Sequence, residues 1–479
     1  MNKNIDDKSA DLGMSAGDMQ ELAGRATELI VARITGLRDE APWRGAPRAA
    51  LEPLLREPPP EHGQDALAVL DRVVRDVLPV AARVDHPRFF AFVPSAPTWP
   101  GVVADYLATG FNIFQGTWLG SGGPSQLELV VIDWFRQWIG YPVSGGGLFT
   151  SGGSAAILDA LVAAREHQGA PLRPAVFMSD QSHSALERAA HIIGVRPDGI
   201  VKVAAGPDYR IGIDGLGRAV AEARGRGQTP IAVCANAGTT NTGAIDPLPE
   251  MAAFCTKERI WLHVDAAYGG FAMLCERGKA LLAGLELADS ISLDAHKWLF
   301  QPFEAGCLMV RDVAALERAF SVHPEYLQDT RLGMEQVNFA DRGLQLTRSF
   351  RALKVWMSIQ TFGLAAFRHA IAQGIELADR AGDFVRQSGC LELLSPPSLG
   401  ILCFRFRPAV SGAPARELDE LNEKIQARVI ASGLAMLSST RLHGAYSLRF
   451  CIMSHQTTWD DVRSTLEAIE ATGRELIRG

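Results

Sequence analysis

The sequence predicts an α/β protein built on a mostly parallel β-sheet, and three observations support this fold class. Strand-like and helix-like segments alternate between residues 145 and 312, which is the order typical of a parallel sheet. Two apolar segments, residues 260–264 and 290–293, are each followed closely by charged residues, as at the crevice along the carboxyl ends of such a sheet. The chain has 479 residues, too many for one compact core, so we expect two or three domains.

The composition is that of a globular protein, with 47% apolar and 21% charged residues. The 47 basic and 54 acidic residues give a net charge of −7, which argues against nucleic acid or a membrane surface as a partner. Seven cysteines are scattered without CxxC spacing, a pattern that indicates buried, reduced thiols. Because no signal-peptide core and no run of about 18 apolar residues is found, we expect a soluble cytoplasmic protein.

The first hundred residues predict an N-terminal helical arm. Helical periodicity covers residues 19–37 and 66–84, and the segment between them contains Glu57-Pro58-Pro59-Pro60-Glu61, which cannot continue a helix. The alternative is that these helices pack against their own chain. We expect three parts, namely the arm over residues 1–100, a large domain over 101–375 and a small C-terminal domain over 376–479.

The other elements follow from periodicity and turn residues. A helix over residues 125–139 is closed by Gly140, a residue that favours a helix C-terminus. A helix over 214–224 has Asp214 as its expected N-cap, and a long helix from 345 to 387 is interrupted at Gly363. The sequence also predicts large-domain strands at 176–179, 200–203, 230–235 and 307–310, and a small α+β domain with strands 401–406, 435–438 and 446–452 and helices 415–432 and 459–475.

A glycine-rich loop, Ser151-Gly152-Gly153-Ser154, precedes a helix that continues to residue 165. Glycines at this place let the free N–H groups of the helix approach an anion, and the helix dipole favours negative charge there. Most loops of this kind only cap a helix. The loop predicts a phosphate site only if other residues of the same chemistry accompany it.

Two further segments supply such residues, His263-Val264-Asp265-Ala266-Ala267-Tyr268-Gly269-Gly270 and Asp289 to Trp298, which reads DSISLDAHKW. An aspartate that pairs with a pyridinium nitrogen and a lysine that forms a Schiff base are the groups that pyridoxal 5′-phosphate (PLP) needs. In sequence and order the two segments resemble the group II PLP-dependent amino acid decarboxylases, the family of aromatic-L-amino-acid decarboxylase. The resemblance implies a fold type I enzyme with PLP as cofactor, Lys297 as the Schiff-base lysine and Asp265 as the pyridinium partner.

The same resemblance implies roles for other cofactor-binding residues. Gly153 and Ser154 correspond to the phosphate-binding loop. The segment SDQSHSALERA contains His183, which corresponds to the histidine that stacks on the cofactor ring and assists proton transfer. Thr240 is expected beside the cofactor ring. His296 is expected either to orient the cofactor phosphate or the substrate, or to have only a packing role. No metal site is predicted.

A substrate pocket is also implied by the resemblance. Its expected lining is Phe92, Val93, Ser95, Trp118, Phe303 and Thr347. Phe92, Trp118 and Phe303 favour an aromatic or bulky apolar amino acid. Gly116 stands where many aromatic decarboxylases have phenylalanine, so a roomier pocket is expected.

Tyr326 matches the tyrosine of the mobile catalytic loop in this family, which reaches the neighbouring subunit's site and protonates the substrate carbon after CO2 leaves. The resemblance therefore implies a homodimer with shared active sites, in which N-terminal arms clasp the partner. The expected reaction is decarboxylation of an L-amino acid to its amine. Three alternatives stay open: oxidative deamination to an aldehyde, aminotransferase or C–S lyase chemistry, and a non-catalytic PLP-binding protein. Retention of Tyr326 and His183 favours the amine.

Overall fold

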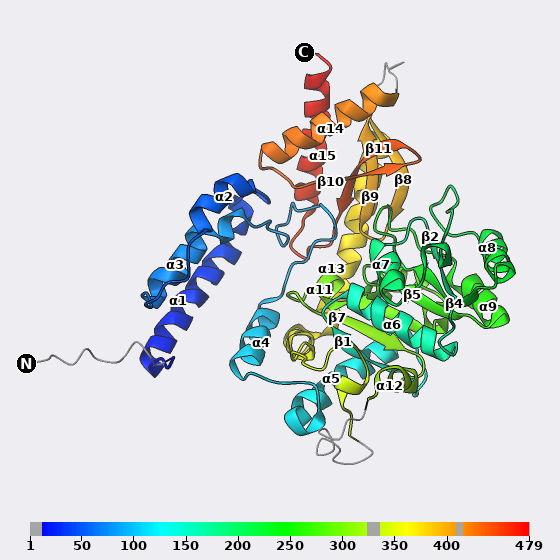
Figure 1. Cartoon of the computed structure of the whole chain (residues 1–479). Coiled ribbons are helices and arrows are strands. Elements are labelled where there is room, and N and C mark those ends of the chain that lie inside the picture. The colour runs from blue at the N-terminus through cyan, green and yellow to red at the C-terminus, as the bar shows by residue number, and fades with distance from the viewer. Residues whose placement is uncertain (1–11, 323–335, 409–414, 479) are drawn as a thin grey trace, which may run out of the picture.

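The computed structural model describes residues 12–322, 336–408 and 415–478, and its large domain contains a seven-stranded sheet (Figure 1). β7 pairs antiparallel with both of its neighbours, β1 and β6, whereas the other pairs are parallel. The prediction of a mostly parallel sheet is therefore confirmed. In spatial order the strands are β1 (Gly146–Thr150), β7 (Gly306–Val310), β6 (Ser290–Asp294), β5 (Trp261–Asp265), β4 (Thr229–Asn236), β2 (Pro174–Ser179) and β3 (Ile200–Val203).

Helices surround this sheet, so that every residue of β1, β2, β6 and β7 is buried. Burial on both faces explains why β2 and β7 read as nearly continuous apolar runs rather than as alternating patterns. The covering helices include α5 (Trp118–Ile139), α6 (Gly153–His167), α7 (Ser184–Ile192), α8 (Ile213–Gly225), α9 (Leu248–Glu258) and α12 (Ala314–Phe320).

Two predicted helix ends had different outcomes. Gly140 ends α5 with φ +86°, the left-handed conformation in which glycine is favoured, so this prediction is confirmed. The prediction that Asp214 is an N-cap is wrong, because Gly212 caps α8 and Asp214 lies in the first turn. A carboxylate is also favoured there, since the first turn is the positive end of the helix dipole.

The C-terminal part forms a four-stranded antiparallel sheet, ordered β10 (Ser438–Leu442), β11 (Ala445–Cys451), β9 (Ile401–Phe406) and β8 (Leu391–Ser398). α14 (Ala415–Ala431) and α15 (Trp459–Leu476) accompany it. The strand predicted over 435–438 is wrong, because β10 begins only at Ser438. β8 was not predicted; its two prolines are tolerated because it lies at the edge of the sheet.

One long helix, α13 (Ala352–Gln387), links the two sheets, and the predicted domain division at residue 375 falls within it. The predicted interruption at Gly363 is confirmed by its non-helical φ of +72°. The helix begins at Ala352 rather than at residue 345, because residues 345–350 form bends and irregular backbone. That segment contains Thr347.

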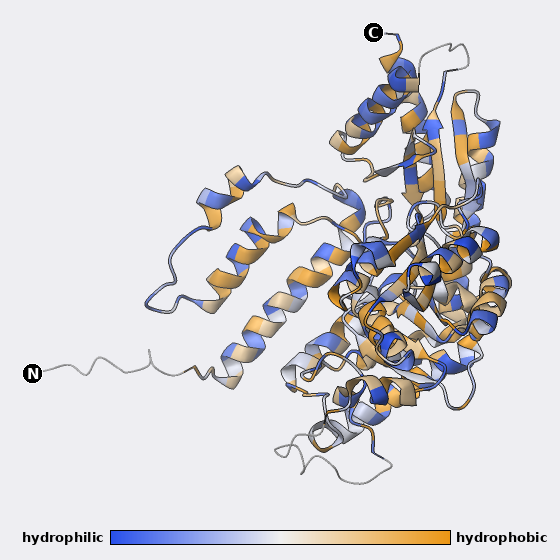
Figure 2. Cartoon of the chain, turned by 45° about the vertical axis from the view of Figure 1, so that its right-hand side comes forward, coloured by the Kyte–Doolittle hydropathy of each residue, from blue (hydrophilic) through white to orange (hydrophobic). Residues whose placement is uncertain are grey.

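The N-terminal arm consists of α1 (Ala16–Thr35), α2 (Arg48–Leu55) and α3 (Ala66–Asp76), which project from the rest of the chain (Figures 1 and 2). None of these three helices contains a buried residue. Figure 2 shows that apolar residues nevertheless recur along them. The exposed apolar side chains of the arm include Met19, Ile30, Val31, Leu54, Leu55, Val69 and Val73.

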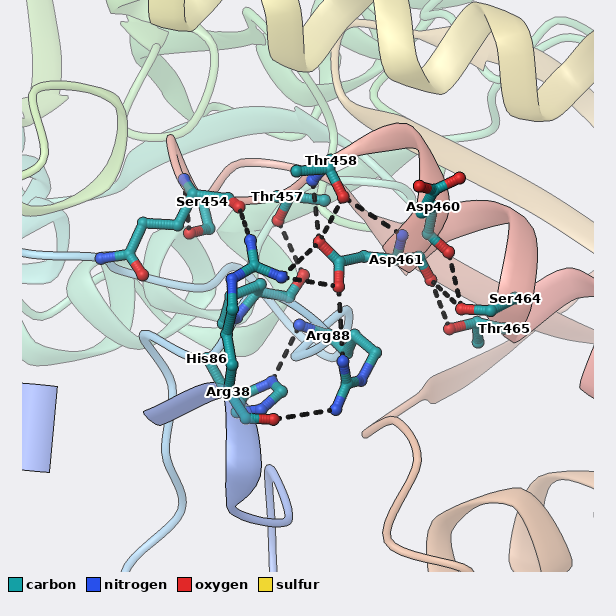
Figure 3. A network of polar contacts seen from close by, with 12 residues as sticks. Arg38, His86, Arg88, Ser454, Thr457, Thr458, Asp460, Asp461, Ser464 and Thr465 are labelled. Carbon is teal, nitrogen blue, oxygen red and sulfur yellow. Dashed lines mark hydrogen bonds and ion pairs between the residues drawn. The ribbon is translucent and has the colours of Figure 1, made fainter. Parts of the chain in front are cut away.

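A polar network joins the end of the arm to the C-terminal domain (Figure 3). Arg38 donates to both carboxylate oxygens of Asp461 at 3.1 Å and to the carbonyl of Gln456 at 2.5 Å. Arg88 reaches the same carboxylate at 3.4 Å. Burial alone would raise the pKa of Asp461, but hydrogen bonds from Thr458 and the Arg38 guanidinium outweigh it and lower the pKa. The carboxylate therefore stays charged and holds three parts of the chain together.

We expect Arg38→Ala to loosen this attachment. The lost hydrogen bonds involve a charged group but a half-exposed guanidinium, so the expected cost is about 1–2 kcal/mol. Cleavage within the arm by a low concentration of protease should then rise roughly 5- to 30-fold. Arg463→Ala, which removes an exposed pair with Asp460, is the control and should change cleavage less than twofold (about 0.4 kcal/mol). Equal cleavage of the two variants would contradict the prediction.

A second prediction concerns Asp159 in α6, where burial raises the pKa of the carboxyl to about 7. An unfolded aspartate has a pKa of about 3.9, so between about pH 4 and 7 the folded chain binds more protons. The free energy of unfolding should therefore fall as pH rises through this window, by up to about 1.4 kcal/mol per pH unit. Asp159→Asn keeps the acceptor for the Leu344 N–H, 3.3 Å away, and should be more stable than the natural chain at pH 8. Urea unfolding of both proteins at pH 5 and pH 8 measures this. The prediction would be contradicted if the free energies of unfolding of Asp159→Asn and the natural chain differed by the same amount at both pH values.

The seven cysteines are all buried and unpaired, which confirms the prediction of free thiols. Among the residues that the structure describes, no helix combines the length and the apolar character needed to cross a membrane.

Candidate functional site

A cavity of about 500 Å³ lies at the carboxyl ends of the parallel strands. Loops that follow β1, β2, β4, β5 and β6 each contribute to its wall, as expected for an open α/β sheet. The predicted site residues that line it are Phe92, Val93, Gly153, Ser154, His183, Thr240, Asp265, His296, Lys297 and Phe303. The structure thus gathers residues that are more than 200 positions apart in the sequence.

The glycine-rich loop connects β1 to α6, which begins at Gly153. A Cβ placed on Gly306 would lie 2.3 Å from the Cα of Gly152. Only a glycine in β7 therefore lets the loop lie this close to the sheet. The first N–H groups of α6 have no carbonyl of their own helix to bind, so they are available to an anion in the cavity.

A buried ion pair holds β1 in place beneath this loop. Arg348 lies 2.6 Å from Glu128 of α5, and both side chains are fully buried. Glu128 accepts the N–H of Phe149 at 2.8 Å, and Arg348 donates to the carbonyl of Phe149 at 2.8 Å. Both polar groups of Phe149, one residue before the end of β1, are therefore held by this pair.

Asp265 is the last residue of β5 and faces the cavity. Its Oδ1 accepts the hydroxyl of Ser292 at 3.0 Å and the N–H of Ala267 at 3.2 Å. Both donors stand at fixed places on the sheet and its loop, so they set the orientation of the carboxylate. The second oxygen can then bind a protonated ligand nitrogen.

Lys297 lies three residues beyond the end of β6, in the short helix α11 (Ala295–Trp298). Its Nζ is 2.9 Å from Oδ2 of Asp294, whose side chain is only 4% exposed. Burial alone would lower the pKa of Lys297, but the Asp294 carboxylate outweighs burial and raises the pKa. The lysine is thus held at the cavity as an ammonium group.

Two histidines have their ring protons placed by backbone hydrogen bonds. The Nδ1 of His183 accepts the N–H of Ala185 at 3.2 Å, and His183 caps α7. The Nδ1 of His296 accepts the N–H of Ala305 at 3.1 Å, and burial lowers the pKa of His296. In each neutral ring the proton is therefore on Nε2.

Only some of the residues predicted for the substrate pocket line the cavity. Phe92, Val93 and Phe303 line the cavity, and the Phe303 ring is 5.0 Å from the His296 ring. The other three lie elsewhere in the single chain: Ser95 is buried and donates to the carbonyl of Gln301, Trp118 begins α5, and Thr347 is exposed before α13.

The expectation of open room beside Gly116 is wrong within this chain. A Cβ at Gly116 would lie 2.5 Å from both the carbonyl oxygen of Leu346 and the ring of Phe114. The space is therefore filled by the segment that leads into α13. Tyr326 lies outside the described residues.

Two charged residues that line the cavity were missed by the sequence analysis, Asp294 and Glu304. Asp294 ends β6 as Asp265 ends β5, so the same argument from strand ends could have found it. Glu304 stands beside Phe303, and its carboxylate lies 3.4 Å from Arg351. No local pattern distinguishes it from an exposed acidic residue.

The residues present fit PLP. The cavity combines an N-terminal helix turn for a phosphate, the Asp265 carboxylate for a ring nitrogen and the Lys297 amine for an aldehyde carbon. One buried polar atom at the site, Oδ1 of Asp294, has no hydrogen-bond partner. Within the described residues no cluster of side chains with metal-binding character is found.

Comparisons with known proteins agree with this geometry. A model of the family described as the pyridoxal-dependent decarboxylase conserved domain matches residues 48–407. The aromatic-L-amino-acid decarboxylase of Bacillus atrophaeus is 39% identical over 471 residues, 98% of each chain. A phenylacetaldehyde synthase of Arabidopsis thaliana is 31% identical and covers 89% of this chain and 90% of its own. The crystal structure of Oryza sativa TDC with PLP and tryptamine has a TM-score of 0.92 at 29% identity, and the match covers 97% of this chain and 99% of that one.

Proposed function

The chain belongs to the pyridoxal-dependent decarboxylase family, and from this premise we propose that it removes CO2 from an aromatic L-amino acid and releases the amine. The PLP-dependent decarboxylase chemistry follows from the family. The substrate class is our proposal. The observation that carries it is the pairing of Lys297 and Asp265 in one cavity with the apolar rings of Phe92 and Phe303.

When bound, PLP supplies an electron sink for the carbon that loses CO2. Lys297 is the proposed point of covalent attachment, because its amine is the only lysine nitrogen among the described residues that line the cavity. Asp265 is the proposed partner of the ring nitrogen. Its carboxylate is already oriented by Ser292 and Ala267, so it would hold a proton on that nitrogen without reorganising.

The residues proposed to move protons are His183 and Tyr326. His183 faces the cavity with its proton on Nε2, the nitrogen that the backbone does not bind. It can therefore donate to a carboxylate or return a proton to carbon. For Tyr326 the support is the sequence match alone. Gly153 and Ser154 are proposed to bind the phosphate, and Thr240 and His296 are proposed to lie against the cofactor.

The substrate side chain is proposed to lie against Phe92 and Phe303. Both rings are more than half exposed although they line the cavity, so a flat apolar group could cover them. Aromatic pairs add about 0.5–1.5 kcal/mol beyond the area they bury. Ser95, Trp118 and Thr347 remain proposals, supported by the sequence match alone.

The test is a reaction of the PLP-loaded protein with L-phenylalanine, L-tyrosine, L-tryptophan, L-leucine and L-glutamate, in air, with products identified by mass spectrometry. An amine from one or more aromatic substrates, at least tenfold above L-leucine and L-glutamate, supports the proposal. Aldehyde with hydrogen peroxide, absent when oxygen is excluded, would replace it with the chemistry named for the Arabidopsis thaliana relative. Equal turnover of L-glutamate would overturn the aromatic substrate class.

We also propose a cytoplasmic homodimer in which the arm contacts the partner. The exposed apolar face of α1 and α3 supports the dimer, and the seven unpaired thiols support the cytoplasmic location.

Val69 and Val73 are four positions apart on one face of α3 and are both exposed. We expect the double substitution Val69→Glu, Val73→Glu to shift the protein from dimer to monomer in sedimentation experiments. Leu172→Glu, at an exposed residue outside the arm, is the control, and a dimer that survives the double substitution would contradict the arm's role.

A further inference from the structure

Asp294 is a buried carboxylate beside the start of α6, where the cofactor phosphate, itself an anion, is proposed to bind. A Cβ placed on Gly153, the first residue of α6, would lie 3.2 Å from Oδ2 of Asp294, and one on Gly152 would lie 4.0 Å from Oδ1. The carboxylate therefore lies beside the loop proposed to hold the cofactor phosphate, with little room between them. Its Oδ1 has no hydrogen-bond partner, although the residue is only 3% exposed.

Several titratable groups surround this carboxylate. Lys297 and His296 lie 2.9 Å and 3.6 Å from Oδ2, and Asp265 faces Lys297 from β5. The thiols of Cys307 on β7 and Cys451 on β11 are also near, but burial raises the pKa of both, so they are neutral. Burial lowers the pKa of His296, which is neutral as well. Lys297 is thus the cation that balances Asp294.

An arriving phosphate would disturb this balance. Two anions within about 4–6 Å raise the pKa of one of them, and a buried charge without a partner is costly. The nearest proton belongs to the Lys297 ammonium. If that proton moves to Asp294, the carboxyl becomes neutral and can donate to the phosphate, and the lysine becomes a free amine.

We propose that Asp294 couples phosphate docking at the start of α6 to the release of Lys297 as a nucleophile. One proton leaves Nζ of Lys297 and binds the Asp294 carboxylate, so that an ammonium and a carboxylate become an amine and a carboxylic acid. No other reactant is needed. Asp294 is therefore a positioning residue that acts through Lys297. This inference rests on the proposed phosphate-binding role of the loop.

The test uses the full-length chain freed of cofactor, with inorganic phosphate as the probe. The rate at which acetic anhydride labels Lys297 is followed by mass spectrometry from pH 7 to pH 10, with and without phosphate, and phosphate binding is monitored by ³¹P NMR. We expect saturating phosphate to speed labelling at pH 8 roughly tenfold, the effect of lowering a lysine pKa by one unit. Without the coupling, the negative phosphate would stabilise the ammonium and slow labelling.

Asp294→Asn has the same shape and cannot accept the proton. In this variant Lys297 should be labelled faster without phosphate, and phosphate should no longer speed it. Asp460→Asn, at an exposed residue outside the site, is the matched control and should respond as the natural chain does. Unchanged or slower labelling of the natural chain with bound phosphate, or an acceleration that persists in Asp294→Asn, overturns the inference. Amine production from an aromatic amino acid would still establish the proposed function in that case, so the two failures are distinguishable.

Discussion

Lys297→Ala is expected to abolish covalent attachment of PLP and to lower the rate of CO2 release by at least about 10⁴-fold, the upper end of what one positioned proton-transfer group contributes. The physical reason is the position of Nζ, which lies in the cavity beside a buried carboxylate. No alanine atom can replace the amine as a bond to the cofactor. The measurements are the visible absorption of the bound cofactor and the rate of amine formation.

Two variants control this prediction. Lys297→Arg keeps a cation beside Asp294 but lacks a primary amine, so it should also lose covalent attachment while it keeps the charge. Lys279→Ala removes an exposed lysine in α10 (Glu276–Leu281) and should leave both measurements unchanged. If Lys297→Ala retained the visible absorption after dialysis, another residue would have to bind the cofactor.

Asp265→Asn is expected to lower the rate by about 10²–10³-fold, the usual effect of removing one preorganised electrostatic group. The substitution keeps the size of the side chain and an oxygen that can accept from Ser292 and Ala267. What is lost is the negative charge that would hold a proton on the ring nitrogen. Without that charge the ring accepts electrons poorly, so kcat should fall far more than KM rises.

The matched control is Ser292→Ala, which removes one hydrogen bond to Oδ1 of Asp265 and leaves its charge in place. A hydrogen bond to a charged group is worth about 1.5–3 kcal/mol, so this variant should lose no more than about 150-fold. The ultraviolet–visible spectrum of the cofactor should shift with pH in Asp265→Asn and stay unchanged in Ser292→Ala. An Asp265→Asn protein with an unaltered spectrum and rate would rule out the assigned role.

Buried strands and helix ends could be predicted because they depend on neighbouring residues. β7 is a continuous apolar run, and Gly140 ends α5 through its own backbone freedom. Since β5 and β6 are parallel neighbours, residues just beyond their carboxyl ends must be close. The strand ends alone therefore predict that Asp265 and Lys297 lie close together.

Errors arose where a local pattern competes with packing. Asp214 is a good N-cap residue, but α8 begins one residue earlier at Ile213. The segment 435–438 is apolar enough for a strand, yet pairing with β11 begins only at Ser438. In both cases several starts are nearly equal in local energy, so tertiary contacts decide between them.

The sequence by itself determined the fold class, through the alternation of strands and helices, and its resemblance to a known family implied the cofactor chemistry and most of the residues around the cavity. Only the tertiary structure decided which charged side chains form ion pairs. Arg348 and Glu128 are 220 positions apart and form a fully buried pair, and Asp294 pairs with Lys297 because both are enclosed at the end of β6. Such pairs depend on the exclusion of water and on distances of about 3 Å, and no spacing along a chain records either quantity.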